Sequence, residues 1–372
     1  MKARSRLAAL AAVLTATAAA GLAAPGQASA DQPFIGPFHT ISTVASTVPA
    51  NGDVNPYGTV VIKHDEGDLH KGSVLVSNFN NSANLQGTGT TLVQIAPDGT
   101  ATQFAQIDPN HLPGECPGGV GLTTALSVLP GGWVVVGSLP TTDGSSGTAS
   151  AGCLLVLDKH GQVRETLAGD GINGPWDMTS VSHGDRTELF VTNVLNGTQG
   201  GGGNEVDQGT VLRISLLRGP GDEPPQRVAS TVIGSGFGEK TDPAALVIGP
   251  TGLGINHDGT LYVADTLGNR ITEIRDAEHR HDSAGTGRVV SSGGDLNGPL
   301  GLALTPCGTI LTVNSMDGYL VETAPHGEQL AKVQLDSSGM PPGAGALFGL
   351  AVDGESGVYF VDDAGNSLEL LH

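Results

Sequence analysis

Aromatic and basic residues are scarce in this chain of 372 residues. Phe, Trp and Tyr make up 4% of the sequence, and 17 Lys and Arg stand against 37 Asp and Glu, for a formal net charge of −20. So acidic a surface repels nucleic acid and anionic lipid, which excludes both as partners. Long helical periodicities are also absent, whereas glycine occurs 57 times. Many short strands joined by tight turns fit this composition best.

The first 30 residues have the pattern of a secretory signal peptide. Lys2, Arg4 and Arg6 precede the apolar run LAALAAVLTATAAAGLAA, and Ala-Ser-Ala at 28–30 forms a small-residue cleavage site. We therefore expect residues 1–30 to be removed and residues 31–372 to form a single secreted domain. A signal anchor is the alternative. No later stretch is long and apolar enough to span a membrane.

A repeated unit runs through the rest of the chain. Its clearest copy is GPTGLGINHDGTLYVADTLGNRITEI, residues 249–274, which reads as strands a, b and c with a tight Asp-Gly turn between a and b. Strand b is apolar on both faces in every copy, as a strand between neighbouring sheets must be. Repeats of about 40–50 residues with up to four strands each are typical of propeller blades. The other copies begin at Asn55, Gly119, Gly174, Gly298 and Ala346.

The sixth copy ends after its third strand, at His372, which leaves one strand missing from the last blade. A spare strand, FHTISTVAST, occupies residues 38–47, ahead of the first copy. We predict that it pairs with residues 366–371 as the outer strand of the last blade. The predicted fold is therefore all-β, a six-bladed β-propeller whose ring is closed by the N-terminal strand.

The fourth copy resembles an NHL repeat, whose typical unit reads P-x-G-[IVL]-x-[IVL], a turn with Gly, [IV]-Y-V-[AT]-D and then N-x-R-[IV]. The fifth and sixth copies match this pattern well, and the first three match it loosely because insertions break their spacing. The resemblance implies a six-bladed propeller over essentially all of the mature chain. It leaves the function open, since the same fold hosts lyases, lactonases and pure binding modules.

A short polar residue stands at the end of each strand b. If these residues ring the mouth of the central channel, their oxygen atoms are of the kind that calcium binds. The senescence-marker/gluconolactonase propellers are similar in placing Asn and Asp around their metal, together with a Glu on strand a that this chain does not have. The alternative is that these side chains cap strand b by bonding backbone amides. The six candidates are Asn78, Ser138, Asn193, Asp265, Asn314 and Asp362.

Three aromatic residues, Tyr57, Trp176 and Phe348, are expected at the start of strand a on the same face of the ring. They either floor an apolar pocket there or pack between blades. The b–c loops on this face are long in the first three blades and short in the last three, so one half of the face is built up. Loops on a rigid scaffold often carry function, although these Gly-rich and Asn-rich loops are equally consistent with variable decoration.

Two functions follow from these patterns. The first is a secreted binding or scaffold module that recognises a small molecule, a glycan or a protein through this face. The second is a metal-dependent hydrolase or lyase acting on a small polar substrate, with Asp265 and Asp362 as metal ligands or bases. We prefer the first, because the sequence offers no nucleophile with a partner base and no G-x-S-x-G motif.

The three cysteines divide between the two faces of the predicted ring. Cys116 precedes strand a of the second blade and Cys153 begins strand c of the same blade, whereas Cys307 lies in an a–b turn of the fifth blade. Export favours a disulfide, and only the first two residues are on the same face. We predict a Cys116–Cys153 bridge that leaves Cys307 free. Three unpaired thiols are the alternative.

Overall fold

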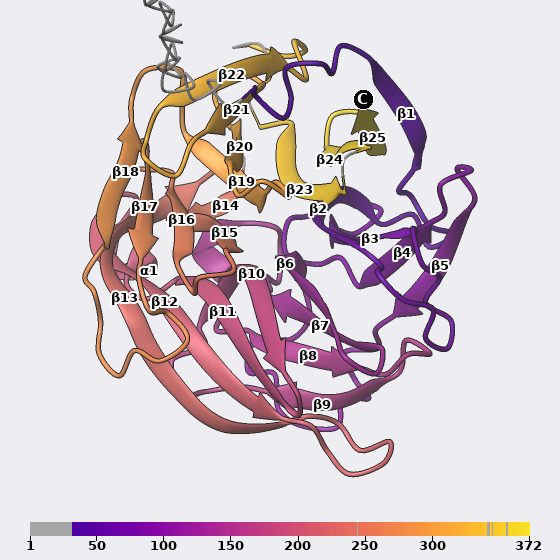
Figure 1. Ribbon diagram of the computed structural model, residues 1–372. Helices are drawn as coiled ribbons and strands as arrows, with labels where there is room; N and C mark the ends of the chain where they lie inside the picture. The colour runs from indigo at the N-terminus through magenta and orange to yellow at the C-terminus, as the bar shows by residue number, and fades with distance from the viewer. Residues whose placement is uncertain (1–31, 244, 341–342, 344, 355) are drawn as a thin grey trace, which may run out of the picture. The chain divides into compact units, whose positions relative to one another are not determined.

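Six antiparallel sheets of four or five strands are arranged around a central axis as the blades of a β-propeller (Figure 1). The computed structural model describes residues 32–243, 245–340, 343, 345–354 and 356–372. The predicted signal peptide, residues 1–30, lies outside these ranges. The blades belong to one compact unit, Pro33–His372.

The first three blades take up the chain as far as residue 248. Blade 1 contains β2 (Val54–Val61), β3 (Val74–Asn80), β4 (Thr91–Ile95) and β5 (Ala101–Gln106). Blade 2 contains β6 (Leu122–Leu129), β7 (Trp133–Ser138), β8 (Cys153–Leu157) and β9 (Val163–Leu167). Blade 3 contains β10 (Gly174–His183), β11 (Arg186–Val194), β12 (Val206–Leu217), β13 (Gln226–Asp242) and β14 (Leu246–Ile248).

The last three blades follow without long interruptions. Blade 4 contains β15 (Pro250–Ile255), β16 (Leu261–Asp265), β17 (Arg270–Ile274) and β18 (Arg288–Ser292). Blade 5 contains β19 (Pro299–Leu304), β20 (Ile310–Asn314), β21 (Tyr319–Thr323) and β22 (Gln329–Gln334). Blade 6 contains β23 (Leu347–Asp353), β24 (Gly357–Asp362), β25 (Ser367–Leu371) and β1 (Ile41–Ser46).

Helical structure among the described residues is confined to loops. A 3-10 turn occupies Ser146–Thr148, and α1 occupies Thr198–Gly201. Within the described residues, no helix is long and apolar enough to cross a membrane.

The innermost strand of each blade contacts the innermost strands of the two blades beside it, so that β2, β6, β10, β15, β19 and β23 form a closed ring. The second strands lie between blades and are buried along almost their whole length, as their two apolar faces predict. We call the end of the ring that carries the turns between first and second strands the lower face. The opposite end, which carries the loops between second and third strands, is the upper face.

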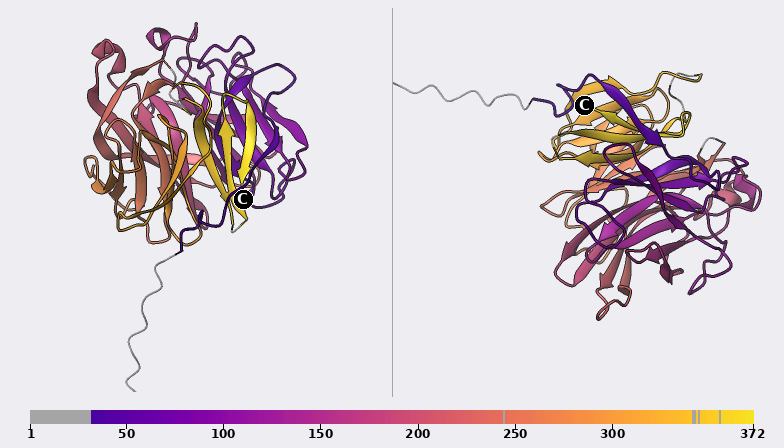
Figure 2. Two further views of the ribbon diagram at one scale, coloured as in Figure 1. Left: turned by 90° about the horizontal axis from the view of Figure 1, so that it is seen from above. Right: turned by 90° about the vertical axis from the view of Figure 1, so that its right-hand side faces the viewer.

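The N-terminal strand closes the ring as predicted. β1 pairs antiparallel with β25, with Ile41 opposite Leu371 and Ser46 opposite Ser367, and the indigo strand lies beside the yellow last blade in both views of Figure 2. The segment before β1 is also fixed, because the buried carboxylate of Glu322 in blade 5 accepts the backbone N–H groups of Phe34 and Ile35, each at 2.9 Å. The segment before β1 is thus bonded to blade 5, and β1 itself completes blade 6.

Blade 3 departs from the four-strand pattern. Its fourth strand continues to Asp242 and then turns back through β14. The return strand is buried, and the carbonyl of Val247 accepts the indole N–H of Trp176 at 2.9 Å. The propeller repeat gave no sign of this fifth strand.

The long loops of blades 1 to 3 touch one another on the upper face. The carbonyl of Gln86 in blade 1 accepts the hydroxyl of Thr141 in blade 2 at 2.5 Å, and Gln199 of blade 3 bonds the carbonyl of Ala149 in blade 2. The predicted disulfide is confirmed: Cys116 and Cys153 are bridged with their Cα atoms 5.2 Å apart, and Cys307 is free and exposed. The bridge fixes the base of the blade 2 loop.

Candidate functional site: the lower half of the central channel

The six polar residues predicted at the channel mouth do end the second strands. In each blade the residue lies opposite the start of the innermost strand, as Asn193 lies opposite Pro175 and Asp265 opposite Pro250. No hydrogen bond joins any two of the six. The full set is Asn78, Ser138, Asn193, Asp265, Asn314 and Asp362.

Their side chains bond within the seam between strands and loops. The side-chain oxygen of Asn193 accepts the N–H of Asn173 at 2.7 Å, and its amide nitrogen donates to the carbonyl of Gly171 at 2.9 Å. Asn314 makes the equivalent two bonds to the segment before its innermost strand. Buried amides bonded in this way hold the segments that enter blades 3 and 5, which corresponds to the capping alternative.

The carboxylates of this set do not fit a calcium site. Asp265 pairs with the guanidinium of Arg270 at 2.7 Å and accepts the N–H of Gly268 at 3.2 Å, so its negative charge is already balanced. Asp362 accepts the N–H of Gly365 at 3.1 Å, and burial raises its pKa. Within the described ranges no group of three His, Cys, Asp or Glu could hold a metal ion. We therefore derive no chemistry through a metal here.

The three aromatic residues meet across the channel. Tyr57 stacks on Phe348 with ring centroids 3.9 Å apart, and Trp176 lies 6.3 Å from both rings. Blade 3 is not adjacent to blades 1 or 6, so these contacts span the axis. Each ring is at most 2% exposed. The aromatics therefore pack against one another and close the upper half of the channel.

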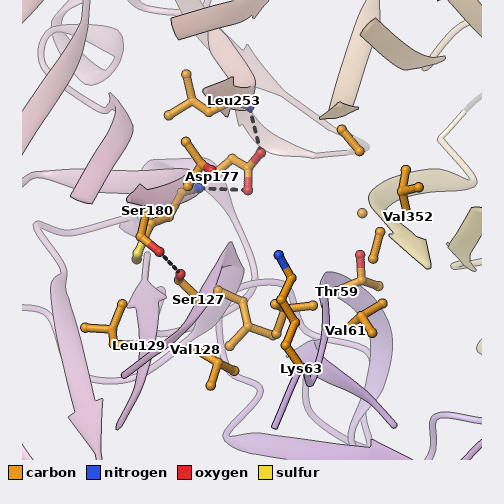
Figure 3. A pocket seen from close by; sticks show the side chains of 18 of the residues that line it. Thr59, Val61, Lys63, Ser127, Val128, Leu129, Asp177, Ser180, Leu253 and Val352 are labelled. Atoms are coloured by element: carbon orange, nitrogen blue, oxygen red, sulfur yellow. Dashed lines mark hydrogen bonds between the residues drawn. The ribbon is translucent and has the colours of Figure 1, made fainter. Parts of the chain in front are cut away.

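Below the aromatic stack the channel is open. A cavity of about 690 Å³ is lined by all six innermost strands and reaches the turns of the lower face (Figure 3). Its volume is within the usual range of small-molecule sites. Exposed Lys63 and His64 stand at its mouth, and Val128, Leu253 and Val352 lie along its walls. The predicted site was on the opposite face.

Among the described residues that line this wall, Asp177 is the one on an innermost strand that carries a carboxyl group. It follows Trp176 in β10, at a place where the corresponding residue of four other blades is glycine. A Cβ at any of those glycines would collide with the backbone of the next blade. At the place of these glycines in blade 3, the side chain of Asp177 faces blade 4. The four glycines are Gly58, Gly252, Gly301 and Gly349.

The Asp177 carboxylate bridges two blades. One oxygen accepts the N–H of Met178 at 2.8 Å, and the other accepts the N–H of Leu253 in blade 4 at 3.0 Å. The side chain is 8% exposed, and burial raises the pKa of Asp177 from 3.8 to about 7, against the lowering effect of the two backbone bonds. A carboxyl group with this pKa can donate or accept a proton near neutrality.

Hydroxyl groups complete the polar part of the wall. Ser127 of blade 2 and Ser180 of blade 3 are joined at 2.7 Å, as Figure 3 shows. The hydroxyl oxygens of Thr59 and Thr124 are buried and bond to no residue within the described ranges. Buried polar atoms without a partner are uncommon, and an incoming polar group is one way of satisfying them.

The fold and the channel define a six-bladed β-propeller with a ligand-sized cavity on its axis. No family model and no curated protein matches the chain. Among solved structures, a streptogramin B lyase superposes with a TM-score of 0.52 at 14% identity, covering 90% of this chain and 98% of that one. A gluconolactonase of Xanthomonas campestris gives 0.51 at 15% identity, covering 89% of this chain and 88% of that one.

A third similar structure is regucalcin of Agrobacterium tumefaciens, described as a calcium-binding protein. It superposes with a TM-score of 0.52 at 14% identity, covering 88% of this chain and 94% of that one. Likenesses at these identities show the fold and carry no residue assignments. The six-bladed propeller is confirmed, whereas membership of the NHL-repeat group remains a prediction from sequence.

Proposed function

We propose that this protein binds a small molecule in the lower half of its central channel. The observation that carries the proposal is the cavity of about 690 Å³, which joins apolar walls to a small number of polar groups around Asp177. This combination is characteristic of ligand sites. The proposal keeps the binding function predicted from sequence and moves it to the lower face, since the aromatic stack closes the upper half.

A fluorescent apolar probe tests the proposal. N-phenyl-1-naphthylamine emits strongly when it leaves water for an apolar cavity, and we expect saturable binding of one probe per chain. Ala303, half-buried in the cavity wall, is replaced by tryptophan (Ala303→Trp) to fill the space. Exposed Ala229 on β13 receives the same substitution as a control. Binding lost in the first variant and kept in the second supports the proposal, and equal binding by both overturns it.

Catalysis at the same place is the second candidate. The pKa of about 7 at Asp177 suits a general acid or base, and it is the specific observation in favour. Two of the similar structures are named as a lactonase and a lyase. Hydrolysis of glucono-δ-lactone above the background rate, with a pH–rate inflection near 7 that disappears in Asp177→Asn, would support an enzyme. If the wild type hydrolyses the lactone at the background rate, ligand binding without catalysis is the function that stands.

Export and recognition by the upper face are also proposals. The predicted leader supports secretion, and N-terminal sequencing of secreted protein beginning at residue 31 would establish it. For a glycan or protein partner, the upper face offers a hollow of about 360 Å³ between the loops of blades 2 and 3, lined in part by Ser150, Asn173 and Gln199. The larger volume and the buried carboxyl group favour the lower cavity as the principal site.

A further inference from the structure

The lower cavity has two polar places separated by apolar wall. One is the carboxyl group of Asp177 with the hydroxyls beside it. The other is Lys63, which follows β2 in blade 1 and extends its ammonium group into the cavity (Figure 3). Val61 lies beside Lys63 and Leu253 lies beside Asp177, and both side chains line the cavity (Figure 3). A molecule that reaches both places must therefore also lie against the apolar side chains of the innermost strands.

Lys63 has no counter-charge of its own. Within the described ranges it makes no ion pair and no side-chain hydrogen bond, whereas Arg270 pairs with Asp265 at 2.7 Å and Arg288 with Glu273 at 2.8 Å. The carboxylate of Asp177 bonds Met178 and Leu253, and within the described ranges no hydrogen bond or ion pair joins it to Lys63. Lys63 is the one Lys or Arg among the described lining residues.

The surroundings of Lys63 narrow the class of ligand. Glu66 and His64 also lie at the rim of the cavity. Because Glu66 carries a carboxylate, the rim as a whole does not attract anions indiscriminately. The net charge of −20 on the chain also works against non-specific anion binding. A cationic ligand, in turn, would have to pass Lys63 to reach Asp177. The arrangement favours a molecule whose negative charge meets the Lys63 ammonium directly while its apolar body lies on the wall.

On the premise that the cavity binds a small molecule, as proposed above, we infer that the ligand is an apolar anion. A single carboxylate or similar anionic group binds the Lys63 ammonium at the mouth, and the apolar body lies along the innermost strands. A hydroxyl or amide at the far end bonds the carboxyl group of Asp177.

Two fluorescent probes that differ by one charge test this inference. N-phenyl-1-naphthylamine is neutral, and 1-anilinonaphthalene-8-sulfonate is the same molecule with a sulfonate. Their dissociation constants are measured by fluorescence titration for the wild type, for Lys63→Met and for Lys71→Met. Exposed Lys71 is outside the cavity lining, so its variant reproduces the change in net charge without touching the site.

We expect the sulfonate to bind at least tenfold more tightly than the neutral probe, and this ratio to fall to about one in Lys63→Met while Lys71→Met keeps it. Equal affinities in the wild type, or a ratio unchanged in Lys63→Met, overturn the anion inference and leave the binding site standing. If neither probe binds, the proposed function itself fails. The two failures are therefore distinguishable.

Discussion

The carboxylate of Asp177 in blade 3 accepts the backbone N–H of Leu253 in blade 4 at 3.0 Å. Four other blades have glycine at the corresponding place and pack directly on the next blade. Asp177 therefore joins two innermost strands through its side chain, and the lower cavity lies beside this junction. One titratable group, the carboxyl group of Asp177, therefore affects both the stability of the contact between blades 3 and 4 and the properties of the lower cavity.

That group makes stability depend on pH. Because the pKa of Asp177 is about 7 when folded and near 3.8 in the unfolded chain, the folded protein keeps a proton between these values that the unfolded chain has released. The contribution of Asp177 to the free energy of unfolding is fully present below about pH 4. It is lost as the pH rises through 7, and the loss amounts to up to about 4 kcal/mol.

Asp177→Asn removes this titration and leaves the other groups in place. The stability of the wild type relative to Asp177→Asn should fall between pH 4 and 7 and stay level above 8, as measured by urea unfolding at each pH. Parallel pH profiles for the two proteins would show that Asp177 titrates normally.

The N-terminal seam depends on Glu322. Its buried carboxylate accepts the N–H groups of Phe34 and Ile35 and the hydroxyl of Thr309. Glu322→Ala leaves these donors without a partner, at a cost of about 3 kcal/mol in the free energy of unfolding. Exposed Glu328 on the same blade gives the control variant Glu328→Ala, which should change little. Similar melting temperatures for both variants would argue against a stabilising role for the bonds from Phe34 and Ile35 to Glu322.

Ring closure by β1 has a stronger consequence. Deleting residues 31–48 removes β1 and exposes the edge of β25, which is then free to pair with other chains. We expect aggregation or a large fall in melting temperature. Both are measured during a thermal ramp, with light scattering reporting aggregation. A soluble deletion variant with an unchanged melting temperature would mean that the C-terminal three strands form a stable blade alone.

The disulfide should stabilise the chain substantially. Cys116 and Cys153 are 37 residues apart, and closing a loop of this length contributes about 4 kcal/mol, less any native strain. The double variant Cys116→Ala/Cys153→Ala should lose stability in this range, whereas Cys307→Ser should not. A cross-linked peptide in a non-reduced digest identifies the bridge by mass spectrometry, and a bridge that includes Cys307 would contradict the fold.

Calcium is expected to have little effect. Asp265 is paired with Arg270, and Asn193 and Asn314 use both ends of their amides. A ligand that binds only the folded state raises the melting temperature, so we predict no rise at millimolar calcium. A rise that disappears in Asp265→Ala/Asp362→Ala would restore the metal-dependent hydrolase or lyase.

The sequence was sufficient for those features that repeat along the chain. Blade number, the closing strand and the disulfide followed from the spacing of the units and from the alternation of strand direction. β14 did not, because it belongs to one blade only and is held by burial of Val247 and its bond to Trp176. Such contacts have no periodic signature.

The lower cavity was not predicted from the sequence for a related reason. Polar residues at strand ends were visible, but their use as caps depends on loops that vary between blades. The signal that could have identified Asp177 was a difference between copies: blade 3 reads Pro-Trp-Asp-Met where blades 4 and 5 read Pro-x-Gly-Leu. A charged residue in place of a glycine that packs on the next blade marks a position where that blade differs from the repeat.

The carbon-13 resonance of the Asp177 carboxyl group tests the central claim most directly. It is assigned by comparison with Asp177→Asn and followed against pH with and without N-phenyl-1-naphthylamine. We predict a titration midpoint near pH 7 that moves upward with probe, because an apolar neighbour displaces the remaining water from the carboxyl group. A midpoint near 4 that does not respond to the probe would contradict both the buried carboxyl group and the ligand site beside it.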